Sequence, residues 1–381
     1  MPTSSFPVAN TLTVGFEYTL TRAAPTARDL RVDICVIGAG SGGLTVAAGA
    51  SQMGADTALI EGGTMGGDCL NTGCVPSKSL LAAARVADTH RRSARFGVNG
   101  HEPAIDFLGV HRHVHGVIAA IAPHDSQERF EGLGVKVIRA PARFSGANEV
   151  VAGDDRIRAK RIVIATGSSP LVPDIPGLAE VPYLTNETIF GNTERPEHLL
   201  VIGGGPVAIE MAQAHRLLGA QVTVLQRSRI LRRDDPELVE VVRRRIVADG
   251  VELAEGVEIL GVERARNHIA VVIRNGGAER RIEGSHLLVA AGRRPNVDGL
   301  GLDRGGIEYS DKGIPVDARL RTTNKCVFAI GDVTGGHRFT HMAAHHAGIV
   351  IRNALFRLPA RADRHAVPWV TFTEPELAHV G

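Results

Sequence analysis

Two stretches of the chain repeat the same pattern of hydrophobic and polar positions. Each begins with a short apolar run, continues through a glycine-rich turn into a helical segment, and closes with a second apolar run. Short apolar runs bounded by glycine are typical of strands that are buried in a parallel sheet. The pattern predicts two βαβ units, with the segments 32–37, 38–43 and 57–61 in the first and 199–202, 203–208, 209–218 and 222–225 in the second.

The two turns have nearly the same glycine spacing. The first reads G-x-G-x-x-G, with Gly38, Gly40 and Gly43, and the second reads G-x-G-x-x-A, with Gly203 and Gly205. Between a strand and a helix, such glycines permit a tight turn and let a pyrophosphate approach the backbone at the helix N-terminus. The sequence therefore predicts an α/β protein with two Rossmann-like domains, each of which binds a dinucleotide.

The residue that ends the second strand differs between the two units. In the first unit it is Glu61, a carboxylate that can accept a hydrogen bond from a ribose 2′-hydroxyl. Its counterpart in the second unit is Gln226, which does not repel a 2′-phosphate. Four arginines that could hold such a phosphate follow closely: Arg227, Arg229, Arg232 and Arg233. We predict that the second unit prefers NADPH, with NADH or a merely solvated basic turn as the alternatives.

The remaining elements are predicted from periodicity and from turn residues. Helices are expected over 77–92, 105–132 and 237–249. A β-meander is expected over 135–144 and 149–157, and further strands over 161–168, 251–259, 262–274, 281–288 and 327–330. Prolines cluster between positions 170 and 182, which indicates a connection between two domains.

Composition excludes several classes of protein. The 381 residues carry a formal net charge of +2, and aromatic residues make up 4%, so neither a basic surface nor base-stacking platforms for nucleic acid are expected. No apolar run approaches the length of about 18 residues that spans a bilayer, and the first 30 residues resemble a flexible tail more than a transit peptide. We expect a cytoplasmic enzyme without membrane or nucleic-acid partners.

Candidate chemistry is concentrated in Cys69 and Cys74, two of only four cysteines. In a regular helix, Cα atoms at this spacing lie about 8 to 9 Å apart, beyond the roughly 7 Å limit for a disulfide, so a bridge needs the distorted turn that Gly73 permits. A strained bridge is easily reduced, and the nearby Lys78 would lower the pKa of a thiol. A stable structural disulfide, a zinc site and two unpaired thiols are the alternatives.

The segment GGDCLNTGCVPSK, residues 66–78, closely resembles the active-site segment of the class I pyridine nucleotide-disulfide oxidoreductases. This family includes dihydrolipoyl dehydrogenase, glutathione reductase and mercuric reductase. The resemblance implies a redox-active Cys69–Cys74 disulfide beside FAD. It assigns Cys74 as the thiol nearest the flavin, Cys69 as the thiol that exchanges with substrate, and Lys78 as the partner of Glu210.

Further motifs resemble those of the same family. The turn after residue 164 resembles the ATG motif that closes over FAD, the segment 290–296 resembles the link back to the FAD domain, and Gly331-Asp332 resembles the end of the strand that binds the ribityl chain. Arg227 and Arg232 resemble the pair that grips NADPH in glutathione reductase. The cofactor-binding residues implied are Gly38, Gly40, Gly43, Glu61, Lys78, Ala142, Thr166, Gly167, Ser168, Gly203, Gly205, Gln226, Arg227, Arg232, Gly292 and Asp332.

The resemblance also divides the chain into domains. An FAD domain over 31–184 and 291–365 is expected to be split by an inserted NAD(P) domain over 185–290, after a tail over 1–30. Residues 366–381 resemble the opening strands of the α+β interface domain through which the family forms homodimers. That domain supplies an acid-base histidine across the interface, and no residue of this chain is assigned to this role.

We predict an FAD-dependent NAD(P)H:disulfide oxidoreductase that passes hydride from NADPH through the flavin to the Cys69–Cys74 disulfide. The acceptors left open are dihydrolipoamide, a low-molecular-weight disulfide or a metal ion such as Hg(II); the sequence has no vicinal cysteine pair, which disfavours a full mercuric reductase. The alternative is a truncated, non-catalytic FAD-binding remnant, or a fragment with diaphorase activity only. No residue is assigned as a metal ligand. His111, His113 and His115 are two residues apart, and on a helix this spacing does not bring them onto one face; the histidines after position 336 are expected to lie on a helix that faces the flavin.

Overall fold

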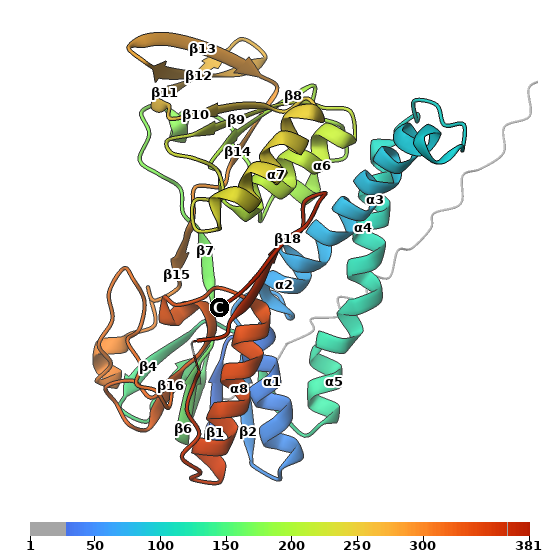
Figure 1. The fold of residues 1–381 in the computed structure, drawn as a ribbon. Helices are drawn as coiled ribbons and strands as arrows, with labels where there is room; N and C mark the ends of the chain where they lie inside the picture. The colour runs from blue at the N-terminus through green and yellow to red at the C-terminus, as the bar shows by residue number, and fades with distance from the viewer. Residues whose placement is uncertain (1–27, 364) are drawn as a thin grey trace, which may run out of the picture.

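The computed structural model describes residues 28–363 and 365–381, and it places the two predicted βαβ units in two separate parallel sheets (Figure 1). The mixed α/β class predicted from the sequence is confirmed. Most of the tail predicted over 1–30 lies outside the described residues, whereas Asp29 and Leu30 already belong to the first strand. In the described part of the chain, no helix is both long enough and apolar enough to cross a membrane.

The larger sheet contains the first unit. Its strands are β1 (Asp29–Ile37), β2 (Thr57–Ile60), β3 (Lys136–Ile138), β4 (Ala142–Gly146), β5 (Glu149–Ala152), β6 (Asp155–Ile164) and β16 (Val327–Ala329). The parallel part runs β3–β2–β1–β6–β16, while the start of β6 pairs with the antiparallel β5 and, through it, β4. The carboxyl ends of β1, β6 and β16 therefore meet at one edge, where ligands bind in sheets of this type.

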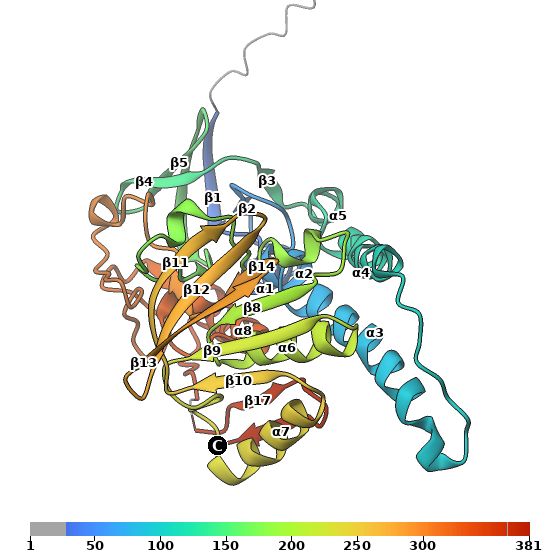
Figure 2. The same ribbon diagram turned by 90° about the horizontal axis from the view of Figure 1, so that it is seen from above.

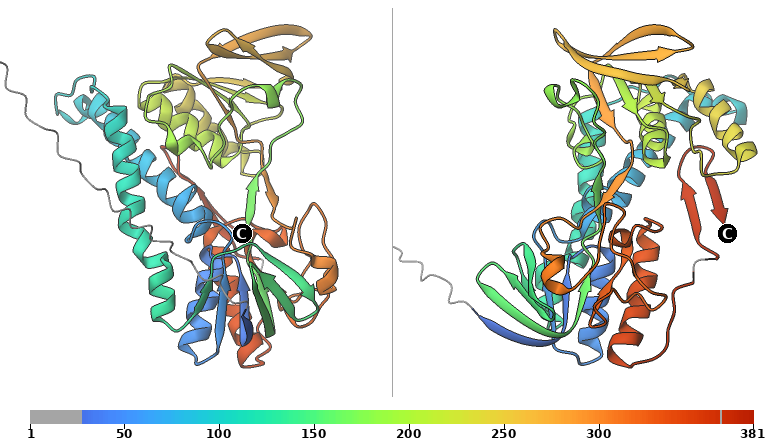
Figure 3. Two further views of the ribbon diagram at one scale, coloured as in Figure 1. Left: turned by 180° about the vertical axis from the view of Figure 1, so that it is seen from behind. Right: turned by 90° about the vertical axis from the view of Figure 1, so that its left-hand side faces the viewer.

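Helices cover this sheet and extend away from it (Figures 1 and 3). α1 (Ser41–Gln52) and α8 (Thr340–Leu355) pack side by side on one face, with Leu44, Val46 and Ile349 buried against the strands. The short α2 (Gly67–Asn71) leads into the long α3 (Cys74–Arg92), which runs beside α4 (Phe107–Ile121) before α5 (Gln127–Gly132) returns to the sheet.

The smaller sheet contains the second unit. Its parallel strands run in the order β10 (Glu252–Glu255), β9 (Gln221–Gln226), β8 (His198–Ile202) and β14 (His286–Val289). α6 (Pro206–Leu217) and α7 (Pro236–Ala248) cover one face (Figure 1). The antiparallel strands β11 (Glu258–Ala265), β12 (His268–Asn275) and β13 (Ala278–Gly284) cover the other.

The two units are joined by a pair of strands and by a C-terminal hairpin. β7 (Ser168–Pro170) pairs with β15 (Arg293–Pro295), so the chain leaves and re-enters the first unit through adjacent strands. β17 (Pro368–Thr371) and β18 (Leu377–Val380) form a hairpin beside α7 (Figure 2).

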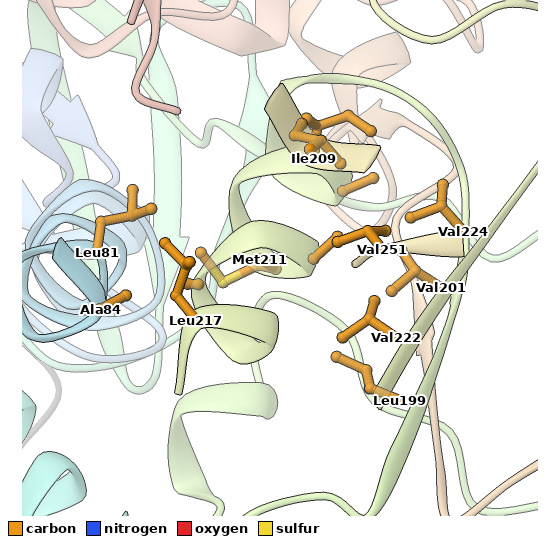
Figure 4. Packing of buried hydrophobic residues seen from close by; sticks show 14 of the residues in the cluster. Leu81, Ala84, Leu199, Val201, Ile209, Met211, Leu217, Val222, Val224 and Val251 are labelled. Atoms are coloured by element: carbon orange, nitrogen blue, oxygen red, sulfur yellow. The ribbon is translucent and has the colours of Figure 1, made fainter. Parts of the chain in front are cut away.

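The hydrophobic core of α6 ties the two units together. Figure 4 shows Leu81 and Ala84 of α3 on one side of α6, and Val201 and Val224 of the second sheet on the other. All four side chains are buried, as is Met211 of α6 between them. Because α3 begins at the dithiol, this packing fixes the dithiol segment against the second unit.

Five sequence predictions of individual elements were wrong. Two expected strands, 251–259 and 281–288, are each divided between two strands, β10 and β11 in the first case and β13 and β14 in the second. The helix expected over 105–132 is interrupted by a 3-10 turn over Ala122–Asp125, because Pro123 cannot continue an α-helix. The meander expected from residue 135 begins only with β4, since β3 joins the parallel sheet beside β2. The strand expected over 262–274 contains the turn between β11 and β12, where Arg266 adopts a φ of 50°.

Candidate functional site

One cleft of about 2740 Å³ lies between the two units. Both glycine turns, both cysteines and the β7–β15 connection line it. Two residues singled out from the sequence, Gly43 and Arg229, do not line the cleft. The predicted catalytic and cofactor-binding residues that line it are Gly38, Gly40, Glu61, Cys69, Cys74, Lys78, Ala142, Thr166, Gly167, Ser168, Gly203, Gly205, Glu210, Gln226, Arg227, Arg232, Gly292 and Asp332. The fold thus brings together residues that span almost 300 positions of sequence, while their individual roles remain predictions.

The first glycine turn is a cradle that side chains would fill. Gly38 has a φ of 104°, and a Cβ there would lie 2.4 Å from the carbonyl oxygen of Ala165. Gly40 precedes α1 without a side-chain cap, so the first N–H groups of the helix remain available to an anion at the cleft. Glu61 accepts hydrogen bonds from the backbone N–H groups of Ala39 and Gly63, both at 2.6 Å, which holds its carboxylate at the turn. These features fit a dinucleotide whose pyrophosphate lies over the turn.

Gly43 has a packing role beneath the turn. A Cβ at this position would lie 1.8 Å from the carbonyl oxygen of Gly38, whereas the equivalent position of the second unit holds the fully buried Ala208 without conflict. We expect Gly43→Ala to destabilise the protein by roughly 1 to 3 kcal/mol, as overpacking does, and to weaken FAD retention. Urea denaturation and the flavin content of purified protein measure this. The matched variant Ala208→Gly should lose about 1 kcal/mol or less of stability from helix propensity and should keep its flavin; equal losses in the two variants would contradict the clash.

The second glycine turn has the same backbone geometry, but the residues beside it differ from those beside the first. Gly203 has a φ of 126°, with a Cβ position 2.3 Å from the carbonyl oxygen of Ala290, and Gly205 precedes α6 without a side-chain cap. Gln226 packs against Gly204 at the end of β9. Three exposed arginines line the cleft beside this turn, and no ion pair of their side chains is found among the described residues: Arg227, Arg232 and Arg233.

The dithiol is built from two helix ends. Cys69 lies in α2 and Cys74 is the first residue of α3, with Gly66 and Gly67 at positive φ before them. The four cysteines, Cys35 and Cys326 included, are thiols in this structure. A hydrogen bond from the Cys69 thiol, supported by Thr340 and by the charge of Lys78, lowers the pKa of Cys74 to about 6. The same hydrogen bond, together with burial, raises the pKa of Cys69. The pair therefore holds one thiolate and one proton near neutral pH, as a redox-active dithiol requires.

Lys78 and Glu210 form an ion pair across the two units. Lys78 Nζ lies 3.0 Å from Glu210 Oε2, with 38% of the lysine side chain and 6% of the glutamate side chain exposed. The backbone N–H of Phe372 donates to Glu210 Oε1 at 2.9 Å, and the Phe372 ring lies 4.3 Å from Lys78 Nζ. The pairing of Lys78 with Glu210 expected from the family motif is present in the structure, while its catalytic role stays a prediction.

Thr340 and Arg293 line the cleft but were not among the site residues predicted from the sequence. Thr340, at the start of α8, has its hydroxyl 3.2 Å from Cys74 Sγ. Arg293 donates to Ser168 and lies 3.3 Å from Asp68. Asp332 accepts from the Ser168 hydroxyl at 2.6 Å, and burial raises the pKa of its carboxyl. The neighbouring Gly292 was the available signal for Arg293, whereas nothing in the sequence pointed to Thr340.

The histidines do not gather into a metal site in the described residues, where no group of three or more His, Cys, Asp or Glu side chains could hold an ion. His111 and His115 lie one turn apart on α4, with their rings 4.2 Å apart. Of the histidines after position 336, His337, His341 and His346 line the cleft.

The comparisons with known proteins agree with this arrangement. Residues 32–347 match the family model of the pyridine nucleotide-disulphide oxidoreductases. The chain belongs to this family. Membership implies a flavin and a pyridine nucleotide as cofactors, and it confirms the family resemblance seen in the segment 66–78.

The proteins similar to this chain include enzymes named for different substrates. A mercuric reductase of Staphylococcus aureus is 36% identical over 356 residues, which cover 93% of this chain and 65% of the relative. A dihydrolipoyl dehydrogenase of Geobacillus stearothermophilus is 33% identical, with 92% of this chain and 76% of the relative covered. The Cu(II) complex of the flavoprotein disulfide reductase RclA from Escherichia coli superposes with a TM-score of 0.82 at 27% identity, over 92% of this chain and 77% of that one. The chain spans less than two thirds of the first of these relatives.

Proposed function

We propose that this protein is an FAD-dependent NAD(P)H:disulfide oxidoreductase whose electrons leave through Cys69 and Cys74. The observation that carries the proposal is the position of a dithiol with one acidic thiol in the same cleft as two dinucleotide-type turns. Disulfide reductases need this arrangement, because the electron pair must pass from one nucleotide to the thiols within a single enclosed site.

The first unit would hold FAD and the second the nicotinamide nucleotide. Gly38, Gly40 and Glu61 would bind the adenosine half of FAD, and the Ala142 and Thr166–Ser168 segments with Asp332 would line the rest of its course. When bound, FAD accepts hydride from the nicotinamide and supplies an electron pair to the disulfide. In this division the FAD domain comprises 31–184 and 291–365 and the nucleotide domain 185–290, supported by the two separate sheets.

The chain's own residues account for the thiol chemistry. Two electrons and one proton convert the Cys69–Cys74 disulfide into one thiol and one thiolate, and the pKa values place the proton on Cys69 and the charge on Cys74. Cys69 would attack an acceptor disulfide while its proton passes to the leaving sulfur, which departs as a thiol, after which the Cys74 thiolate attacks Cys69 Sγ, restores the disulfide and releases the second sulfur as a thiolate. Thr340 donates to Cys74, and Lys78 offsets its charge.

The terminal acceptor is proposed as a low-molecular-weight disulfide or a metal ion. Both classes are represented among similar proteins, a dihydrolipoyl dehydrogenase and a disulfide reductase on one side and mercuric reductases on the other. Steady-state NADPH oxidation with lipoamide, glutathione disulfide and Hg(II) in parallel discriminates between them. Turnover with artificial electron acceptors alone would support the diaphorase-only alternative. As in the family, we propose a cytoplasmic homodimer.

We expect NADPH to be preferred over NADH because of the arginines beside the second turn. A charge-assisted contact with the 2′-phosphate is worth about 1.5 to 3 kcal/mol, or roughly ten- to a hundredfold in affinity. Arg227→Ala and Arg232→Ala should each reduce this preference, measured as flavin reduction rates at equal coenzyme concentrations. Arg264→Ala, an exposed arginine of β11 outside the cleft, is the matched control. Equal wild-type rates with the two coenzymes would refute the preference.

A further inference from the structure

The loop that carries Arg232 and Arg233 also carries an acid that does not pair with them. Asp234 follows the two arginines directly, and its residue is only 5% exposed. Its carboxylate oxygen Oδ1 accepts instead from the indole Nε1–H of Trp369, at 2.7 Å. A carboxylate beside two arginines could form an ion pair with either of them. Asp234 instead accepts a hydrogen bond from a tryptophan more than a hundred residues away, which leaves both arginines without this partner.

The loop is held at both ends. The N–H of Leu231 donates to the carbonyl of Gly204 at 2.7 Å, which fastens the loop to the second glycine turn, and the N–H of Asp234 donates to the carbonyl of Leu231 at 2.9 Å. Arg232 and Arg233 lie between these points, exposed and lining the cleft. Their position is thus set by the glycine turn on one side and by the Asp234–Trp369 bond on the other.

Trp369 is itself held by rings from two other elements. Its ring stacks on His379 of β18 with centroids 4.0 Å apart and lies nearly parallel to Phe339, at 6.2 Å. The hairpin β17–β18 places it beside α7, where the arginine loop ends (Figure 2). The indole donor is therefore fixed in direction before any ligand binds, so it costs little to keep Asp234 in place.

Further arginines lie near the loop. Burial chiefly lowers the pKa of Arg338; the charge of Asp332 opposes this shift, and the charges of Arg293 and Arg233 add to it. A carboxylate that turned into this region would pair with an arginine and compete with an incoming phosphate. The hydrogen bond from the uncharged indole of Trp369 keeps the Asp234 carboxylate away from the arginines, and it does so without adding a positive charge.

We propose that Trp369 is a specificity-determining residue for the nucleotide: by binding Asp234, it keeps Arg232 and Arg233 free for a 2′-phosphate monoester. The inference rests on the proposed preference for NADPH. It extends that preference to a residue outside the second unit and outside the glycine-turn motif. Trp369 acts through Asp234 and is a positioning residue.

The test measures binding of two adenosine fragments by isothermal titration calorimetry, with no turnover needed. Adenosine 2′,5′-bisphosphate carries the 2′-phosphate and adenosine 5′-monophosphate lacks it. In Trp369→Phe, which keeps the ring and removes the donor, the affinity for the bisphosphate should fall by about tenfold, with the monophosphate unchanged. Asp234→Asn keeps an acceptor for the indole and should bind the bisphosphate within about threefold of wild type.

The double variant Trp369→Phe/Asp234→Asn decides the mechanism, because its neutral amide cannot compete with the phosphate. Recovery of bisphosphate binding in the double variant supports the proposal.

Three results would overturn the proposal: an unchanged bisphosphate affinity in Trp369→Phe, an equal loss of affinity for both fragments, or a double variant that binds the bisphosphate as weakly as Trp369→Phe. If Trp369→Phe does not fold, a gain of tenfold or more in Asp234→Asn alone overturns it, since the acid would then already oppose the phosphate in the native protein. A wild-type protein that does not discriminate between the fragments would instead refute the NADPH preference itself.

Discussion

Replacing either Cys69 or Cys74 by serine is expected to reduce NADPH-dependent disulfide reduction to background while leaving bound flavin in place. The reaction needs two sulfurs that alternate between a disulfide and a dithiol, and each variant has one. Steady-state turnover with lipoamide or glutathione disulfide, together with the flavin absorbance of the purified protein, measures both halves of the expectation. Activity above a tenth of wild type in either variant would show that the pair is not the exit for electrons.

The corresponding alanine variants should differ in the thiolate signal that remains. Cys74 has a pKa of about 6, so in reduced protein its thiolate should appear as pH rises through about 6 and disappear on acidification below it. Cys69→Ala removes the hydrogen bond that contributes most to this shift and should move the titration upward, toward the ordinary thiol pKa. Thiolate absorbance in the ultraviolet follows this titration, and a long-wavelength thiolate–flavin band should persist in Cys69→Ala and be absent from Cys74→Ala.

Controls are available in the other two cysteines. Cys35 is fully buried and burial raises its pKa to about 12, so it should stay silent over the working range. Cys326 is exposed, and Cys326→Ser therefore provides a background free of surface thiol signal. A titration near pH 6 that survives Cys74→Ala would contradict the assignment of the acidic thiol.

The local parts of this fold could be predicted because each depends on neighbours in sequence. The glycines of both turns are required by positive φ at Gly38 and Gly203, and the chain direction from strand to helix is set within a few residues. The same holds for the dithiol, where Gly66 and Gly67 shape the start of the helix that carries Cys69 and Gly73 directly precedes Cys74 at the start of α3. Local requirements of this kind restrict the residue type and its spacing, so they can be recognised in the sequence.

The unpredicted parts depend on tertiary packing or on unusual turn residues. Thr340 reaches Cys74 across 266 positions of sequence, because α8 packs beside α1. The β11–β12 turn was missed since Arg266 adopts a conformation that usually calls for glycine or asparagine. β3 was assigned to a meander because a three-residue edge strand has no periodicity to show which neighbour it pairs with.

The ion pair between Lys78 and Glu210 should respond unequally to loss of its two members. Lys78→Met leaves the Glu210 carboxylate buried, with only the Phe372 N–H as a donor. Loss of one member of a fully buried pair costs about 3 to 5 kcal/mol; since the lysine is 38% exposed, we expect about 2 kcal/mol. Glu210→Gln keeps an acceptor for that N–H and leaves a lysine that water can reach, so its cost should be below about 1 kcal/mol.

The same asymmetry should appear in the chemistry. Lys78 is the cation that helps to lower the pKa of Cys74, so Lys78→Met should raise this pKa and slow NADPH-dependent flavin and disulfide reduction by about 10² to 10³-fold, as loss of an aligned charge does. Glu210→Gln retains the cation and should slow the reaction by about tenfold or less. Stopped-flow reduction and urea denaturation measure the two quantities. Lys160→Met, which breaks an exposed pair with Asp33, should change stability by less than about 1 kcal/mol and leave the rate unaltered. Equal rates for Lys78→Met and Glu210→Gln would mean that the pair acts only through its geometry, because the charge on Lys78 would then contribute nothing of its own.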